Sequence, residues 1–235
     1  MNRYYKQSRG LNAVDCIIFG FDGENLKILL IKRGFEPEKG KWSLMGGFVQ
    51  GNENLDQASN RILKQLTGLD GMYLEQLHTF SDPDRDPIER TISTAYFALI
   101  DLNKYETQIS AEYHPEWFAL KRLPKLIFDQ QEMVEMAKRR LRYKAALHPI
   151  MFELLPSRFT IPQLQNLYES VYNTTIDKRN FSKRVLATGL LIKQDEKDKS
   201  GSKRGAFYYQ LNMQNYYANF QSFLNFIPNP THLIF

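Results

Sequence analysis

The stretch from Gly40 to Leu69 constrains the fold more than any other part of the chain. It contains two adjacent glycines, Gly46 and Gly47, then a polar segment, and then apolar residues at helical spacing that end at Gly68. A glycine directly after such a run is typical of a helix terminus, because glycine adopts the left-handed conformation without strain. The sequence therefore predicts a loop, a helix over residues 54–67 and a second loop.

The spacing of residues in this stretch resembles the Nudix box. Six of the nine defined positions match, namely Gly47, Glu53, Arg61, Leu63, Gly68 and Leu69. The preceding Trp-x-Leu-x-Gly-Gly segment, from Trp42 to Gly47, also resembles this family, although Met45 stands where proline is usual. The resemblance implies a loop, helix and loop that hold a divalent metal against a diphosphate.

The three mismatches fall on the part of the helix that would bind the metal. Ile62, Gln65 and Leu66 occupy the positions of the family's glutamates, and these positions share one helix face. Magnesium prefers carboxylate or water oxygens as ligands. On this helix face, Ile62 and Leu66 offer no ligand atom, and Gln65 offers only a neutral carbonyl oxygen. We therefore expect no metal, no cofactor and no hydrolysis here. Glu53 and Arg61 remain, and we interpret them as structural residues at the helix start.

The surrounding segments predict an α/β fold. Strand-like runs are expected at 13–21, 26–32, 72–79, 91–100 and 115–120, with a hairpin turn at 22–25 and a long amphipathic helix at 126–147. This order is that of the Nudix α/β/α sandwich, which we assign to residues 1–150 as an effector-sensing domain. The single cysteine, Cys16, excludes an internal disulfide and is expected to be buried.

The loop at 78–90 is long for a simple turn, and long loops are often functional. It resembles an Asp-Pro-x-Arg-Asp-Pro loop of ADP-ribose-related Nudix domains, although it also fits a solvated hairpin connection. A neutral sugar would need no metal and could bind to polar and aromatic side chains. The candidate effector-binding residues are Trp42, Phe48, Asp82, Asp84, Arg85 and Arg90.

Residues 151–235 have a different character and predict a second domain, which we expect to bind DNA. A helix beginning at Thr160, with Pro162 in its first turn, has an apolar face of Leu164, Leu167, Tyr168 and Val171. A second helix follows Asp177, and its inward residues are expected to be Phe181, Val185 and Leu186. A β-hairpin at 192–211 completes the order of a winged helix-turn-helix.

The positive charge is concentrated in this second domain. Residues 151–235 carry 10 basic and 6 acidic side chains, and residues 178–204 carry 9 and 3. Basic side chains neutralise nucleic-acid phosphates, whereas polar residues near a helix start can reach base edges. The candidate DNA-binding residues are Lys178, Arg179, Asn180, Ser182, Lys183, Arg184, Lys203 and Arg204. A merely solvated charged face, or a surface for RNA or protein, remains an alternative.

The two domains together resemble the Nudix-related transcriptional regulators. That resemblance implies a homodimer that binds a palindromic double-stranded operator and releases it when a small molecule binds. We predict a repressor with a catalytically dead Nudix domain that senses a pentose such as L-arabinose. The alternatives are an ADP-ribose-sensing regulator of NAD metabolism, or an active hydrolase that recruits metal through Glu53, Glu75 or Glu89. No run reaches the ~18 apolar residues of a membrane span, so we expect a cytoplasmic protein without membrane contact.

Overall fold

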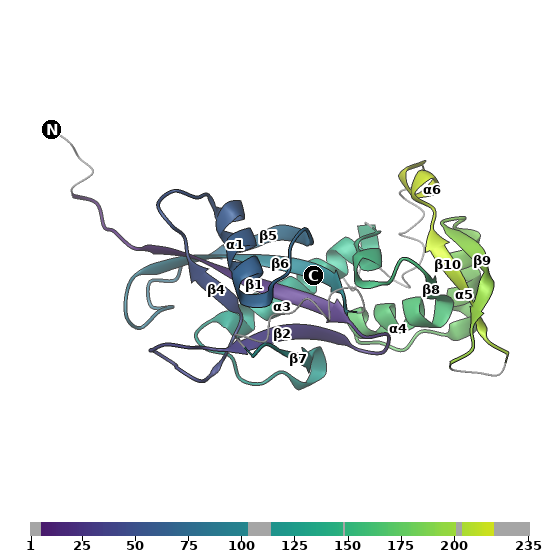
Figure 1. The fold of residues 1–235 in the computed structure, drawn as a ribbon, viewed down its shortest axis with the longest axis horizontal. Helices are drawn as coiled ribbons and strands as arrows, with labels where there is room; N and C mark the ends of the chain where they lie inside the picture. The colour runs from purple at the N-terminus through teal and green to yellow at the C-terminus, as the bar shows by residue number, and fades with distance from the viewer. Residues whose placement is uncertain (1–5, 103–113, 148, 201–203, 219–235) are drawn as a thin grey trace.

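The computed structural model describes residues 6–102, 114–147, 149–200 and 204–218. An α/β part lies at one end of the long axis, and helices α4 and α5 with a small sheet lie at the other end (Figure 1). In the described ranges, no helix combines the length and the apolar character needed to cross a bilayer.

The α/β part is built around strand β1 (Leu11–Phe21). This strand pairs in parallel with β6 (Thr91–Asp101), and antiparallel with β2 (Leu26–Lys32) and β4 (Met45–Phe48). The sheet is completed by β3 (Trp42–Ser43), β5 (Tyr73–Phe80) and β7 (Glu116–Ala119). Residues 14–21 of β1 are all buried, which explains why this segment is an unbroken apolar run apart from Asp15 and Gly20.

Two helices cover opposite faces of this sheet. Alternate residues of a strand point to opposite faces. Cys16 and Ile18 belong to one apolar cluster with Ile62 of α1 (Leu55–Thr67), whereas Ile17 and Phe19 belong to another with α3 (Gln130–Leu147). The predicted α/β/α sandwich and the buried Cys16 are therefore confirmed.

Local signals place both ends of α1. Asn54 accepts a hydrogen bond from the Gln57 amide, and the Gln57 side chain accepts one from the Asn54 amide. Gly68 adopts a φ of 77° and donates to the Lys64 carbonyl. This capping box and glycine terminus agree with the predicted helix to within one residue.

The long helix predicted at 126–147 begins later than expected. Residues 126–129 were expected to be helical, but α3 begins at Gln130. Leu126 forms a bridge to Trp42, and Phe128 has a φ of 47°, which is incompatible with a right-handed helix. Strands β3 and β4 were also not predicted, because they are short and lie in the glycine-rich approach to α1.

The C-terminal part has the helices and hairpin of a winged helix. It contains the 3₁₀-helix η4 (Pro149–Leu154), α4 (Ile161–Tyr172), α5 (Lys178–Ala187), β8 (Phe159–Thr160), β9 (Leu191–Asp198), β10 (Ala206–Leu211) and α6 (Met213–Ala218). The three strands are ordered β8-β10-β9. Thr160 caps α4 through a capping box with Gln163, as the sequence indicated for the helix start.

The predicted apolar face of α4 is confirmed, because its four members are all buried. On α5, Phe181 and Val185 are buried as expected, but Leu186 is 47% exposed. Leu186 follows Val185 directly, so it points about 100° away from the buried face. The prediction that Leu186 points inward is therefore wrong.

Helix α3 joins the two parts of the molecule. The Arg142 guanidinium donates through Nε to the Val171 carbonyl of α4 at 2.9 Å, and the Tyr172 hydroxyl donates to the Arg142 carbonyl at 2.9 Å. The Ser170 hydroxyl also donates to the Glu24 carbonyl of the β1–β2 turn at 3.1 Å. One apolar cluster continues across this junction. The exact division of the chain at residue 150 stays a prediction.

Candidate effector cavity and DNA interface

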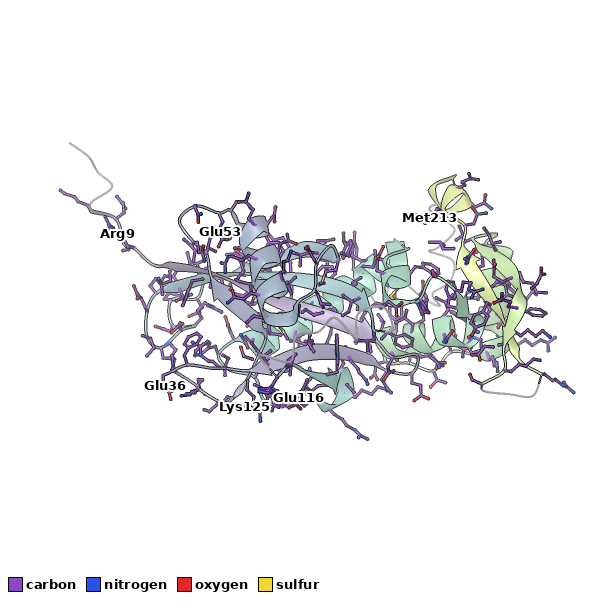
Figure 2. The ribbon with its side chains drawn as sticks, viewed as in Figure 1. Arg9, Glu36, Glu53, Glu116, Lys125 and Met213 are labelled. Carbon is purple, nitrogen blue, oxygen red and sulfur yellow. The ribbon has the colours of Figure 1, made fainter. Side chains whose placement is uncertain are left out.

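A cavity of about 400 Å³ lies beside β1, β4 and α1. Its apolar walls include Val14, Ile31, Leu44, Phe48, Leu66 and Phe128. Its polar groups include Asp15, Arg33, Arg85 and Gln130. In Figure 2, Glu36 marks the segment after β2 and Glu53 marks the segment before α1. Both labels lie at the end of the molecule that is away from α4 and α5. An apolar cavity with a few convergent polar groups is typical of a small-molecule site.

The floor of the cavity contains a buried carboxylate. Asp15 accepts a hydrogen bond from the Ser93 hydroxyl at 2.6 Å and one from Gln130 Nε2 at 2.9 Å. Burial raises the pKa of Asp15, although these bonds and the charge of Arg85 oppose that shift. Gln130 Oε1 in turn accepts the Leu44 amide at 2.9 Å. The first residue of α3 is thus fixed to the strands below the cavity.

An arginine from the 81–90 loop completes this floor. Arg85 forms two hydrogen bonds to the Asp129 carboxylate, both at 2.8 Å, and its Nη2 lies 3.8 Å from Asp15 Oδ2. Its side chain is only 4% exposed. A two-point arginine–carboxylate pair fixes orientation as well as charge. The loop is therefore tied to the residue that precedes α3.

A second arginine lies in the cavity wall. Arg33 follows β2 and is half-buried, and its Cζ lies 4.0 Å from the ring centroid of Phe35 and 5.3 Å from that of Phe128. Its Nε donates to the Phe35 carbonyl at 3.2 Å. Burial lowers the pKa of Arg33, although Asp86 and Asp15 oppose the shift. The guanidinium nevertheless remains charged.

The helix face that would bind a metal in a Nudix enzyme is apolar here. Ile62 is buried against Gly47, where a Cβ would lie 2.9 Å from Ile62 Cδ1. Leu66 lines the cavity, and Gln65 is exposed. Over the described residues, no three His, Cys, Asp or Glu side chains come together as a possible metal site. These side chains do not fit a divalent cation on α1.

Glu53 has another partner. Its carboxylate accepts Arg61 Nε at 2.8 Å and the Gln50 amide at 2.8 Å, and the bond from Arg61 is the main reason that its pKa falls to about 2. Arg61 also donates to the Phe48 carbonyl at 3.0 Å. The pair braces the loop before α1, which agrees with the structural role that we expected.

Glu75 and Glu89 are the other two acidic residues that could recruit a metal if the protein were a hydrolase. Glu75 on β5 accepts Lys144 Nζ at 2.7 Å and does not line the cavity. Glu89 is exposed in the loop before β6. Neither lies in a cluster that could hold a metal within the described residues.

Only two of the six residues predicted to bind the effector, Phe48 and Arg85, line the cavity. Trp42 packs edge-on against Phe118, with ring centroids 4.7 Å apart. Asp82 and Asp84 are exposed in the turn of their own loop, and Arg90 donates to the Asp82 carbonyl at 3.1 Å. The six side chains therefore do not share this cavity, and their contact with an effector stays a prediction.

Sequence reasoning missed several polar residues of the cavity, among them Asp15, Arg33 and Gln130. One signal was available for Asp15, because it is a charged residue inside an apolar strand. Such a residue is rarely buried unless it is paired. Nothing comparable marks Gln130, whose role depends on partners 86 and 115 residues away.

The candidate DNA-binding residues of α5 share an accessible surface. Lys178, Arg179, Asn180, Lys183 and Arg184 are exposed, and Ser182 is half-buried. In the described part of the chain, none of the four cations of α5 has a carboxylate within salt-bridge distance. Arg204 is exposed beside the hairpin tip, and Lys203 lies outside the described residues. Free cations on a helix are suited to nucleic-acid phosphates.

The sheet of the hairpin adds two further cations. Lys193 and Lys197 of β9 lie over the Phe207 ring of β10, with Nζ atoms 3.6 Å and 4.3 Å from its centroid. Cation–π contacts hold both ammonium groups on one side of the hairpin without removing their charge.

The fold and the cavity define a Nudix-type domain with a degenerate box, joined to a winged helix-turn-helix. Comparisons with known families agree, because the NUDIX domain matches residues 11–140 and the NrtR DNA-binding winged helix domain matches residues 151–211. This chain belongs to the NrtR family of regulators, which join these two domains.

Individual relatives add detail. The chain is 35% identical, over 92% of its length and 88% of the relative, to the ADPR responsive transcriptional repressor NtrR of Acinetobacter baylyi. It is 38% identical to the ADP-ribose pyrophosphatase of Methanocaldococcus jannaschii, over 52% of this chain and 70% of the relative.

Solved structures of Shewanella oneidensis NrtR are also similar. Its complex with a 27mer DNA has a TM-score of 0.74 and 30% identity, covering 86% of this chain and 94% of that chain. Its NUDIX domain complexed with ADP ribose has a TM-score of 0.52 and 31% identity, and the match covers 59% of this chain and 92% of that chain.

Proposed function

We propose that this chain is a transcriptional repressor that binds operator DNA through its winged helix and releases it when ADP-ribose enters the cavity. The observation that carries the proposal is the path of α3. This helix begins at the cavity floor with Gln130, next to the Arg85–Asp129 pair, and its second half is bonded to α4 through Arg142. One rigid element thus connects the candidate ligand site to the DNA-binding part.

ADP-ribose replaces the pentose that we predicted from the sequence. The relatives do not support a sugar, whereas the names of three of them refer to ADP-ribose. The cavity volume of about 400 Å³ agrees with this change. Cavities of about 300–1,000 Å³ hold ligands much larger than a pentose, and apolar or aromatic walls suit a nucleobase.

The proposed mechanism is a shift between two arrangements of the winged helices. A ligand that interacts differently with the two positions of α3 favours one of them. Ligand and operator then oppose each other reciprocally. A homodimer on a palindromic operator fits this mechanism, since two half-sites one helical turn apart require one fixed spacing of the recognition helices. A DNA partner also supports the cytoplasmic location that we expected from the sequence.

We propose no hydrolytic reaction for the cavity. The support is the side-chain chemistry of α1, where Ile62 and Leu66 offer no ligand and Glu53 is bonded to Arg61. The rival is a hydrolase similar to the pyrophosphatase relative. Magnesium-dependent release of AMP from ADP-ribose, abolished by Glu53→Gln, would favour that rival.

The test is a titration of DNA with the full-length protein. A duplex selected by the protein from a random pool serves as the operator, and a scrambled duplex and the matching RNA serve as controls. We expect ADP-ribose in EDTA to weaken operator binding, and L-arabinose to have no effect. An operator affinity that ADP-ribose leaves unchanged would contradict the proposal, as would a preference for RNA.

A further inference from the structure

The cavity wall contains a cation, Arg33, that has no carboxylate within salt-bridge distance among the described residues, although Asp86 and Asp15 act on its charge from further away. Only Nε of the Arg33 side chain donates a hydrogen bond, and among the described residues neither terminal nitrogen has a partner or a carboxylate at salt-bridge distance. The side chain is half-buried, and burial already disfavours its charged form. A partly buried charge is costly unless it is paired. Arg33 is therefore available for an anion from outside the chain.

Two other arginines of the α/β part are already paired with carboxylates. Arg85 is paired with Asp129, and Arg61 is paired with Glu53. Arg33 differs from both, because aromatic rings rather than carboxylates hold its guanidinium. Stacking fixes the plane of the group and keeps its charge.

The backbone and the rings hold Arg33 in position before a ligand arrives. The Arg33 amide donates to the Lys41 carbonyl at 2.9 Å, and the Gly40 amide donates to the Arg33 carbonyl at 2.7 Å. Phe35, which stacks on the guanidinium, is 56% exposed, so burial in the core does not explain its place. Such preorganisation reduces the entropy that binding would otherwise lose.

A diphosphate needs a positive partner in this cavity. The side chains of α1 do not fit a divalent cation, since Ile62 and Leu66 replace its ligands. An arginine fork can bind two phosphate oxygens at once. We infer that Arg33 binds the diphosphate of the effector directly and takes over the role that a metal has in Nudix enzymes. This inference rests on the proposed function and names the residue that recognises the anion.

Calorimetric titration of the full-length protein with ADP-ribose tests the inference. The comparison includes the parent, Arg33→Met, Arg33→Lys and Arg122→Met, where Arg122 is an exposed arginine of the same domain that does not line the cavity. We expect the parent to bind equally well in EDTA and in magnesium. Arg33→Met should weaken binding by about 10- to 100-fold, Arg33→Lys should weaken it less, and Arg122→Met should have no effect.

Adenosine separates loss of the anion contact from general damage. Adenosine lacks the diphosphate, so we expect it to bind Arg33→Met and the parent with equal affinity. We also expect the two proteins to have the same melting temperature without ligand. Equal ADP-ribose affinity of Arg33→Met and the parent would overturn the inference, as would loss of binding in EDTA. The proposed function would survive either result if ADP-ribose still released DNA.

Failure of the proposed function gives a different pattern. If the parent does not bind ADP-ribose at all, inorganic pyrophosphate serves as the probe. Binding of pyrophosphate to the parent that is lost in Arg33→Met supports the anion site with another effector. Equal or absent binding of pyrophosphate in both proteins overturns the inference.

Discussion

The two ends of α3 are attached to the rest of the molecule in different ways. At its start, Asp129 and Gln130 contact Arg85 and Asp15 through side chains, in a buried charged network that forms the cavity floor. Near its end, the Arg142 side chain donates to the Val171 backbone carbonyl of α4, and the Arg142 backbone carbonyl accepts from the Tyr172 hydroxyl, beside apolar packing. Side-chain charges respond to a ligand, whereas backbone bonds and packing follow the position of the helix. The first end is therefore suited to sense, and the second to transmit.

The second half of α3 is also held to the sheet. Lys144 and Arg140 contact the Glu75 carboxylate of β5, at 2.7 Å and 3.4 Å. The two side chains are four residues apart, so they lie on one face of the helix and fasten that face to β5.

The largest expected effect is at the first end. Asp129→Asn leaves Arg85 without its two-point carboxylate partner, and breaking a buried pair costs about 3–5 kcal/mol. Asp15 lies 3.8 Å from Arg85 and compensates in part, so we expect a loss of about 3 kcal/mol in the free energy of unfolding, measured with urea. Asp84→Asn, in the same loop but exposed, is the control and should change stability by less than about 0.5 kcal/mol. Equal stabilities of the two variants would show that the charged network does not hold this end.

The second effect is at the other end of the helix. Arg142→Met keeps an unbranched side chain that can retain the packing of the arginine stem, and it removes the bond to the Val171 carbonyl, at a cost of about 2 kcal/mol. We expect unchanged affinity for ADP-ribose, but a smaller difference between operator affinities measured with and without it. Arg139→Met, exposed on the same helix, is the matched control. A full response to ADP-ribose in Arg142→Met would remove the distinction between the two ends.

The third effect separates DNA binding from coupling. Arg179→Ala and Lys183→Ala each remove an exposed cation of α5. We expect each to weaken operator binding and to lower the slope of log affinity against log salt by about 1. The factor by which ADP-ribose changes the affinity should stay constant. Lys39→Ala, an exposed lysine far from α5 in the sequence, is the control, and parent-like binding by both α5 variants would show that this helix is not the recognition helix.

The elements of this molecule could be predicted from sequence where local signals agreed. Asn54 and Gly68 mark the ends of α1, and Thr160 marks the start of α4. The exposed cations of α5 followed from helical periodicity. Local signals failed at Leu126. This apolar residue fits a helical pattern, but in the structure its backbone forms a β-bridge with Trp42.

The cavity floor could not be predicted in the same way. Arg85 and Asp129 are 44 residues apart, and Asp15 and Gln130 are 115 apart, so only the folded sheet brings them together. The loop at 78–90 drew attention to Arg85, but nothing local indicated that its side chain turns inward while Asp82 and Asp84 stay exposed. Tertiary partners decide such orientations.

The smallest expected effect lies away from both ends of α3. The pKa of Glu53 is about 2 in the folded protein, below its ordinary value of 4.5, mainly because Arg61 donates to its carboxylate. A lowered pKa stabilises the folded state above the ordinary value, and this contribution disappears as the pH falls toward the folded value. The melting temperatures of the parent and Glu53→Gln should therefore differ most at about pH 6, differ less at about pH 3, and converge only near the folded pKa of about 2.

Thermal unfolding at these pH values, with Glu132→Gln on the exposed side of α3 as the control, measures this convergence. A difference that does not change with pH would contradict the role of the Glu53–Arg61 pair as a brace. ADP-ribose affinity and its effect on DNA should be unchanged in Glu53→Gln, since Glu53 belongs to neither end of α3 and does not line the cavity. A loss of effector binding in this variant alone would instead indicate that Glu53 contributes to the ligand site through a metal, and would favour the hydrolase over the repressor.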